Sequence, residues 1–82
     1  MAMSDWKLES KNVLHTQWRR KEGNGGVFVS NKKTEAVEYN QDVLKEGYLA
    51  SGFIDSLDNE KRKVFKSKSQ AMSYARSYMR KN

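Results

Sequence analysis

The residues best suited to chemistry in this sequence are basic, and half of them lie together near its C-terminal end. Eight Lys and Arg residues and no Asp or Glu fall between Lys61 and Asn82, so this segment carries a charge of +8. The first sixty residues hold the other eight bases and all ten acids, which gives them −2 and the chain +6. Because like charges repel, segregated bases favour a partner of opposite sign, and nucleic acid is the commonest such partner. The alternative interpretation is a solvated face that keeps a small domain soluble.

Two groups of bases are the candidate nucleic-acid contacts, one in each half of the chain. On a C-terminal helix, Lys68, Met72, Arg76 and Arg80 repeat every four residues and form one line. Lys and Arg that clamp phosphates need not touch base edges, so we expect weak sequence preference. If about 4–6 phosphates are bound, log affinity should fall against log salt with a slope of about −3 to −5. The candidate residues are Arg19, Arg20, Lys21, Lys61, Arg62, Lys63, Lys66, Lys68, Arg76 and Arg80.

Trp18 stands directly before the first basic group, and two interpretations are open for it. An aromatic ring beside arginines can stack on an unpaired base. A core position is favoured, because a domain this small needs its large apolar side chains inside.

No catalytic, metal or cofactor site is predicted. His15 is the only histidine and the chain has no cysteine, which leaves no partner for a nucleophilic or metal-binding arrangement. The glycine-rich run at residues 23–26 lacks the Gly-Lys-Ser/Thr ending of a phosphate-binding loop and suits a hairpin instead. The paired acids are best explained as solvated charge: Glu35 with Glu38, Asp42 with Glu46, and Asp58 with Glu60. We therefore expect a binding protein and not an enzyme.

Alternating polarity predicts several strands and one secure helix. Strands are expected at residues 5–9, 14–18, 27–29, 48–55 and 62–66, with a turn at residues 57–60. The helix follows a cap at Ser67 or Ser69, and its apolar stripe is made of Ala71, Tyr74, Ala75, Tyr78 and Met79. One domain covering residues 1–82 follows, of the α+β class, with an antiparallel sheet and one or two helices on one face.

Residues 34–47 are ambiguous. Ala36, Tyr39, Val43 and Leu44 have the spacing of one helical face, and Thr34 could cap such a helix, so a helix is favoured over a strand at residues 35–39. The similarity between residues 27–39 and 64–74 then suggests a tandem ββα-ββα arrangement, which depends on that second helix.

The character of the chain also carries a resemblance. It has 82 residues, is basic, and lacks Cys and Pro, and in these respects it resembles the small early proteins of tailed bacteriophages. The segment Val64–Arg76 is similar to the strand-then-helix ending of small ββα domains from bacteria and phages. The resemblance implies a host-takeover or anti-defence role, in which the protein blocks a host RNA- or DNA-processing or defence factor.

The sequence thus predicts a small nucleic-acid-binding protein, with RNA favoured over DNA. A sheet with aromatic residues and the lack of a recognisable DNA-reading helix give RNA its preference. The alternative is a protein-interaction inhibitor that docks its basic face on an acidic host protein. We expect a cytoplasmic protein, because no apolar run is long enough to span a membrane and none near Met1 resembles a signal peptide. We expect it to be a monomer or a weak homodimer.

Overall fold

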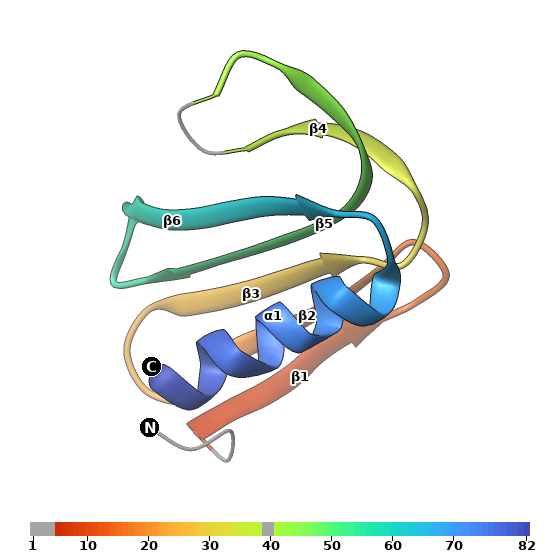
Figure 1. The fold of residues 1–82 in the computed structure, drawn as a ribbon. Coiled ribbons are helices and arrows are strands. Elements are labelled where there is room, and N and C mark those ends of the chain that lie inside the picture. The colour runs from red at the N-terminus through yellow and green to blue at the C-terminus, as the bar shows by residue number, and fades with distance from the viewer. Residues whose placement is uncertain (1–4, 39–40) are drawn as a thin grey trace.

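Six antiparallel β-strands and one helix make up the part of the fold that the structure describes (Figure 1). The computed structural model describes residues 5–38 and 41–82, with residues 57–59 described in their backbone only. The elements are β1 (Trp6–Lys11), β2 (His15–Arg20), β3 (Gly25–Ser30), β4 (Thr34–Val37), β5 (Leu44–Ile54), β6 (Ser56–Phe65) and α1 (Lys68–Lys81). The strands pair in the order β1-β2-β3-β5-β4, and β6 also pairs with β5. The predicted α+β class, an antiparallel sheet with a helix packed on one face, is confirmed.

Local side-chain chemistry explains the tight connections between the strands. Between β1 and β2, the Asn12 side-chain oxygen accepts hydrogen bonds from the backbone N–H groups of Leu14 and His15, at 2.8 and 3.0 Å. Between β2 and β3, Gly23 has φ 75°, which confirms the predicted glycine-rich hairpin. Between β5 and β6, Asp55 has φ 67°, a conformation that Asp tolerates better than most residues.

The turn predicted at residues 57–60 is wrong, because the chain has already reversed before it. The reversal occurs at Asp55, whose N–H donates to the Asn24 carbonyl at 2.7 Å. β6 therefore begins at Ser56 and runs for ten residues. The polar composition of residues 57–60 had indicated a turn, but here it belongs to a strand at the edge of the sheet.

The helix predicted at residues 34–47 is also wrong. The segment forms β4 and the start of β5, which pair from Thr34 opposite Gly47 to Val37 opposite Leu44. The apolar residues of the expected helical face have no core to enter, since Val43 and Leu44 are 64% and 57% exposed. Tyr39 lies outside the described residues. With a single helix in the described chain, the tandem ββα-ββα arrangement is lost.

Small side chains at the contact let α1 lie close to the sheet. Ala71, Ala75 and Met79 of α1 are buried in one cluster with residues that include Val29 and Ala50 of the sheet. The predicted apolar stripe of the helix is thereby confirmed. The Ser67 hydroxyl accepts from the Gln70 N–H at 3.2 Å, which makes Ser67 the helix cap.

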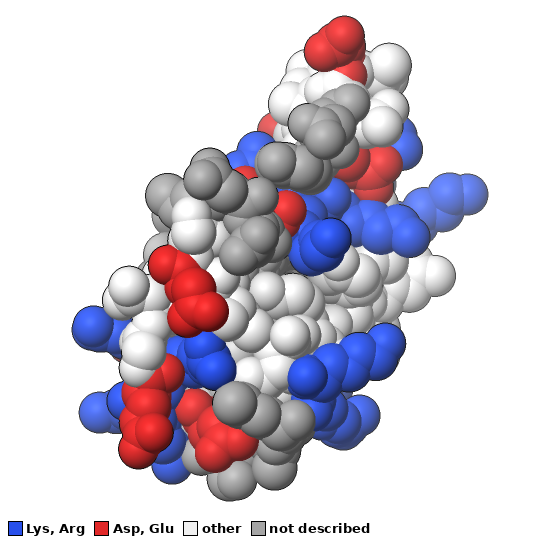
Figure 2. All heavy atoms as spheres, turned by 90° about the vertical axis from the view of Figure 1, so that its left-hand side faces the viewer, with Lys and Arg blue, Asp and Glu red and all other residues white. Residues whose placement is uncertain are grey.

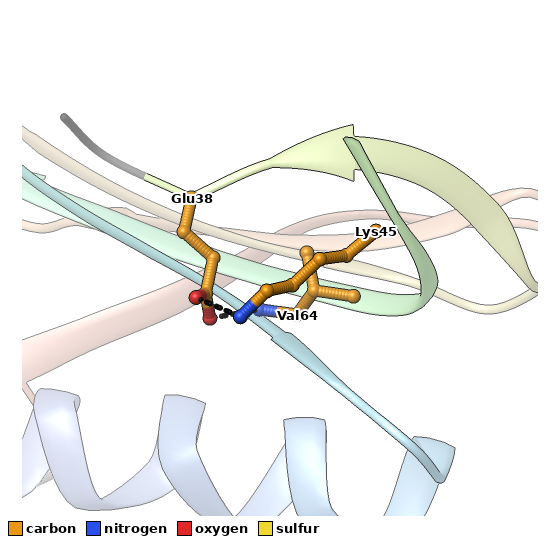
Figure 3. A network of polar contacts seen from close by, with 3 residues as sticks. All are labelled: Glu38, Lys45 and Val64. Atoms are coloured by element: carbon orange, nitrogen blue, oxygen red, sulfur yellow. Dashed lines mark hydrogen bonds and ion pairs between the residues drawn. The ribbon is translucent and has the colours of Figure 1, made fainter. Parts of the chain in front are cut away.

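β5 pairs with β4 up to Gly47 and with β6 from Tyr48 onward, so its pairing changes partner at Gly47. In Figure 1 the β4–β5 hairpin turns out of the main sheet at this part of β5. The hairpin lies on the side of the sheet opposite α1 (Figure 3). A Cβ atom at Gly47 would collide with the Phe65 carbonyl oxygen and would lie 2.8 Å from Cγ1 of Val64. The bend thus requires glycine because the backbone of β6 passes directly over it.

Gly47→Ala should therefore destabilise the protein by about 1–3 kcal/mol, as overpacking does. The matched control is Gly26→Ala, where the new Cβ would lie 3.0 Å from the edge of the Phe53 ring, a side chain that can move. Urea unfolding followed by tryptophan fluorescence measures both variants. A Gly47→Ala variant no less stable than Gly26→Ala would contradict the steric argument.

Candidate nucleic-acid interface

The alternation of β6 separates the three consecutive bases at its centre. Lys61 pairs with Gly52 and Lys63 with Ala50, and both partners lie beneath α1, so the two lysines are on the α1 side of the sheet. Arg62 pairs with Ser51 and projects from the opposite face. There its Nη2 forms an ion pair with Glu60 at 3.2 Å.

The bases of α1 lie on both of its flanks. The Tyr74 and Phe65 rings are 5.3 Å apart, so the flank with Tyr74 faces β6. Arg76 follows Tyr74 by two residues, or about 200° around the helix axis, and so lies on the flank away from β6. The predicted line of Lys68, Met72, Arg76 and Arg80 runs along that second flank, and its three bases are exposed. Lys81 lies about 340° from Tyr74 and returns to the β6 side.

We call the outer side of α1, with the α1-facing side of β6 and the turn between them, the α1–β6 surface. It carries seven cations: Lys61, Lys63, Lys66, Lys68, Arg76, Arg80 and Lys81. None of them forms an ion pair with a side chain that the structure describes. In the N-terminal group, by contrast, Arg19 pairs with Glu9 at 3.7 Å and Arg20 with Asp55 at 3.5 Å. The uncompensated positive charge of the described molecule is therefore concentrated around α1.

A groove with aromatic and hydroxyl groups runs between β6 and α1. It has a volume of about 440 Å³, and its lining includes Phe65, Gln70, Ser73, Tyr74 and Ser77. Figure 2 shows the other end of the same two elements, on the side with the β5–β6 turn and the C-terminal end of α1; there Lys and Arg side chains lie above and below an uncharged band, with Asp and Glu elsewhere on the same face. Cations beside hydroxyl and amide donors are the groups with which proteins hold phosphates.

Tyr74 on this flank, and Tyr78, whose ring lies over Gly52 and 6.4 Å from the Trp6 ring, remain hydrogen-bond donors at neutral pH. Burial raises the pKa of Tyr74 above its usual value of 10.0. The pKa of Tyr78 is also raised, by burial first and then by the neighbouring Tyr74, although Arg20 acts in the opposite direction. Lys63 Nζ lies 5.7 Å from the centroid of the Phe65 ring, a cation–π distance that holds the ammonium group at the groove.

The structure brings together six of the ten predicted residues and places the other four elsewhere. Arg19 and Arg62 project from the face opposite α1, Arg20 lies across Gly25 at the end of the sheet, and Lys21 is in the β2–β3 turn. Lys81 was not among the predicted contacts, although it belongs to the same acid-free run. Trp18 packs against the buried cluster, so the favoured core interpretation of that residue is confirmed.

A carboxylate marks the border of the α1–β6 surface (Figure 3). Glu38 Oε1 accepts from Lys45 Nζ at 2.7 Å, and Oε2 accepts from the Val64 N–H at 3.1 Å. These two hydrogen bonds, and more weakly the charges of Lys45 and Lys63, lower the pKa of Glu38 below 4.5 against the opposing effect of burial. The network ties the β4–β5 hairpin to β6.

The chain matches no protein-family model, no curated protein and no solved structure. Within residues 5–38 and 41–82, no three acidic or histidine side chains are grouped so that they could hold a metal ion. No described helix has the length and apolar character needed to cross a bilayer.

Acid should weaken the wild-type protein more than a Glu38→Gln variant. The lowered pKa of Glu38 means that its contribution to stability is present above about pH 4.5 and is lost as pH falls through the folded-state pKa. Thermal unfolding between about pH 6 and pH 3 should show the wild-type Tm converging on that of the variant. Glu46→Gln, on the same hairpin and largely exposed, is the control and should keep the wild-type pH profile. Parallel profiles for wild type and Glu38→Gln would refute the role of this network.

Proposed function

We propose that the protein binds nucleic acid, RNA in preference to DNA, through the α1–β6 surface. The observation that carries the proposal is the set of seven cations around α1 that form no ion pair with described side chains. Folding places these charges around one helix and the neighbouring strand, and no described carboxylate lies within ion-pair distance of them. A polyanion that binds there releases its condensed counterions and lowers the repulsion among the cations.

The chemistry of the surface favours contact with the phosphate backbone over the reading of base edges. The cations lie on both flanks of α1, and the groove beside the helix offers hydroxyl groups from serine and tyrosine. Such groups fix a strand in place but carry little sequence information. Affinity should therefore depend strongly on salt and weakly on sequence.

Two features favour RNA. α1 is packed flat on the sheet through Ala71, Ala75 and Met79, so it is not presented as a helix that enters a DNA major groove. On the opposite face of the sheet, Phe28 and Phe53 are only half-buried, and the Phe53 ring lies over Gly26. Aromatic rings on an uncovered antiparallel sheet are a surface on which unpaired RNA bases stack.

The biological role that fits this chemistry is inhibition by binding. A basic protein without catalytic residues can occupy the RNA or DNA that a host processing or defence factor needs, in the cytoplasm of a bacteriophage's host. The alternative, in which the basic face docks on an acidic host protein, uses the same cations. Recovery of the tagged protein from cells, with and without ribonuclease, separates them: partners that survive ribonuclease favour the alternative, and partners lost with it favour RNA binding.

Reversal of charge on β6 should sharply weaken RNA binding. For wild type, fluorescence anisotropy with a single-stranded RNA at about 50–200 mM salt should give a slope of about −3 to −4 in log affinity against log salt, for about 4–6 phosphates bound. Lys61→Glu with Lys63→Glu removes two phosphate contacts, so the slope should become shallower by about 1.4 and affinity should fall by at least about tenfold.

The matched control reverses two charges at the other edge of the sheet. Lys7→Glu with Lys11→Glu changes the net charge by the same amount on β1. This variant should lose much less affinity for RNA, because only the long-range electrostatic attraction between the protein and the RNA is reduced. Equal losses in the two double variants would mean that net charge and not the α1–β6 surface determines binding.

A further inference from the structure

A second groove lies on the other side of the sheet, between the face opposite α1 and the start of β4. It has a volume of about 380 Å³, which is within the range of about 300–1,000 Å³ typical of small-molecule sites. Residues from four segments meet there, and those that matter to the argument are His15, Phe28, Lys32, Lys33, Glu35 and Leu49. The groove exists because the bend at Gly47 turns the β4–β5 hairpin out of the sheet.

One wall of this groove is aromatic. The rings of His15 and Phe28 have centroids 5.2 Å apart and an angle of 32° between their planes, so they form a nearly continuous surface. His15 Nε2 lies 3.3 Å from the Ser10 hydroxyl, which limits rotation of the imidazole. Both side chains are half-buried and keep part of their surface open to a ligand. A wall of this kind binds planar rings by stacking.

The β3–β4 connection supplies positive charge to the same groove. Lys32 forms no ion pair with any described side chain, and Lys33 is only 4.0 Å from Glu46 in a largely exposed pair of little strength. Glu35 adds one carboxylate that can accept a hydrogen bond from an exocyclic amino group, such as that of cytosine. An aromatic wall, two lysines and one acceptor together complement a base joined to a phosphate.

We propose that this groove binds one unpaired nucleotide, with its base against Phe28 and His15 and its phosphate beside Lys32 and Lys33. The site is separate from the α1–β6 surface and does not depend on phosphate binding there, although it shares Phe28 with the aromatic face on which the proposed preference for RNA rests. A free mononucleotide and a nucleotide of a single strand share this chemistry. The experiment therefore includes both sources.

The probe is cytidine monophosphate, titrated into the full-length ¹⁵N-labelled protein and followed by NMR. Saturable shifts are expected at the amides of residues 15, 28, 32, 33 and 49. Cytidine has only the base and sugar, and inorganic phosphate has only the charged group. Each should therefore bind more weakly than the monophosphate. A tetracytidylate that binds at least about tenfold more tightly than the monophosphate identifies a strand as the source, and equal affinity identifies the free nucleotide.

Two variants test the two halves of the site. Phe28→Leu should weaken binding of the monophosphate about 5- to 100-fold. The control is Phe53→Leu, the same substitution on the same face but outside the groove, and it should leave this binding unchanged. Lys32→Gln changes an exposed side chain and should leave the fold intact. It should weaken binding of the monophosphate about two- to fivefold and leave the binding of cytidine unchanged.

The outcomes that overturn the proposal are distinct from a failure of the α1–β6 surface. Shifts confined to α1, equal binding of cytidine and its monophosphate, or an unchanged affinity in both Phe28→Leu and Lys32→Gln would each refute a nucleotide site. The Lys61→Glu and Lys63→Glu double variant should bind the monophosphate as wild type does, even though its RNA affinity is reduced. Its behaviour therefore shows which of the two proposals fails.

Discussion

The rest of the structure depends on the pairing of one strand, β5, with three other strands. Its eleven residues pair with β4 at their start, and with β3 and β6 on either side of their later part. Small residues make this possible: Gly47 permits the bend beneath the β6 backbone, Ala50 leaves room for α1, and Gly52 accepts the Tyr78 ring against its backbone. A protein of this size has one small core, and β5 is the strand around which that core forms.

The bend in β5 also explains why the molecule has two different faces. On one side the alanines of α1 pack on the sheet, and the cations of the helix and of β6 are left around the contact. On the other side the hairpin stands away from the sheet and leaves the Phe28 and His15 rings beside an open groove. A single sheet therefore separates a surface suited to phosphates from one suited to a ring. The acids of the chain pair mainly with cations outside the α1–β6 surface, so its charge is not cancelled within the described molecule.

Much of the fold could be predicted from the sequence, because alternation in strands and the stripe of α1 are local signals. The errors have a shared cause. Ala36, Val43 and Leu44 have helical spacing, but whether a segment becomes a helix or a strand also depends on what it pairs with. Each residue of Thr34–Val37 has an antiparallel partner in β5. The position of the β5–β6 turn depends on Asp55 adopting a left-handed conformation, at a position where the sequence has no glycine to indicate it.

The candidate site was only partly accessible to the same reasoning. The segregation of charge pointed to the C-terminal quarter. Alternation alone does not show which face of the sheet each base of β6 occupies, because that depends on the register between β5 and β6. This register puts Lys61 and Lys63 opposite residues beneath α1 and Arg62 on the other face. The second groove could not be predicted at all, because it requires the hairpin that was mistaken for a helix.

The carboxylate of Glu38 has one more consequence, for the behaviour of many copies at once. β6 borders the main sheet, and the outward N–H of Val64 would be a point of attachment for a strand of another molecule if it were vacant. Glu38 already occupies that donor, and repulsion among the cations of β6 acts against the same approach. Both features therefore act against edge-to-edge pairing of β6 between molecules at high concentration, which is the pairing that builds fibres.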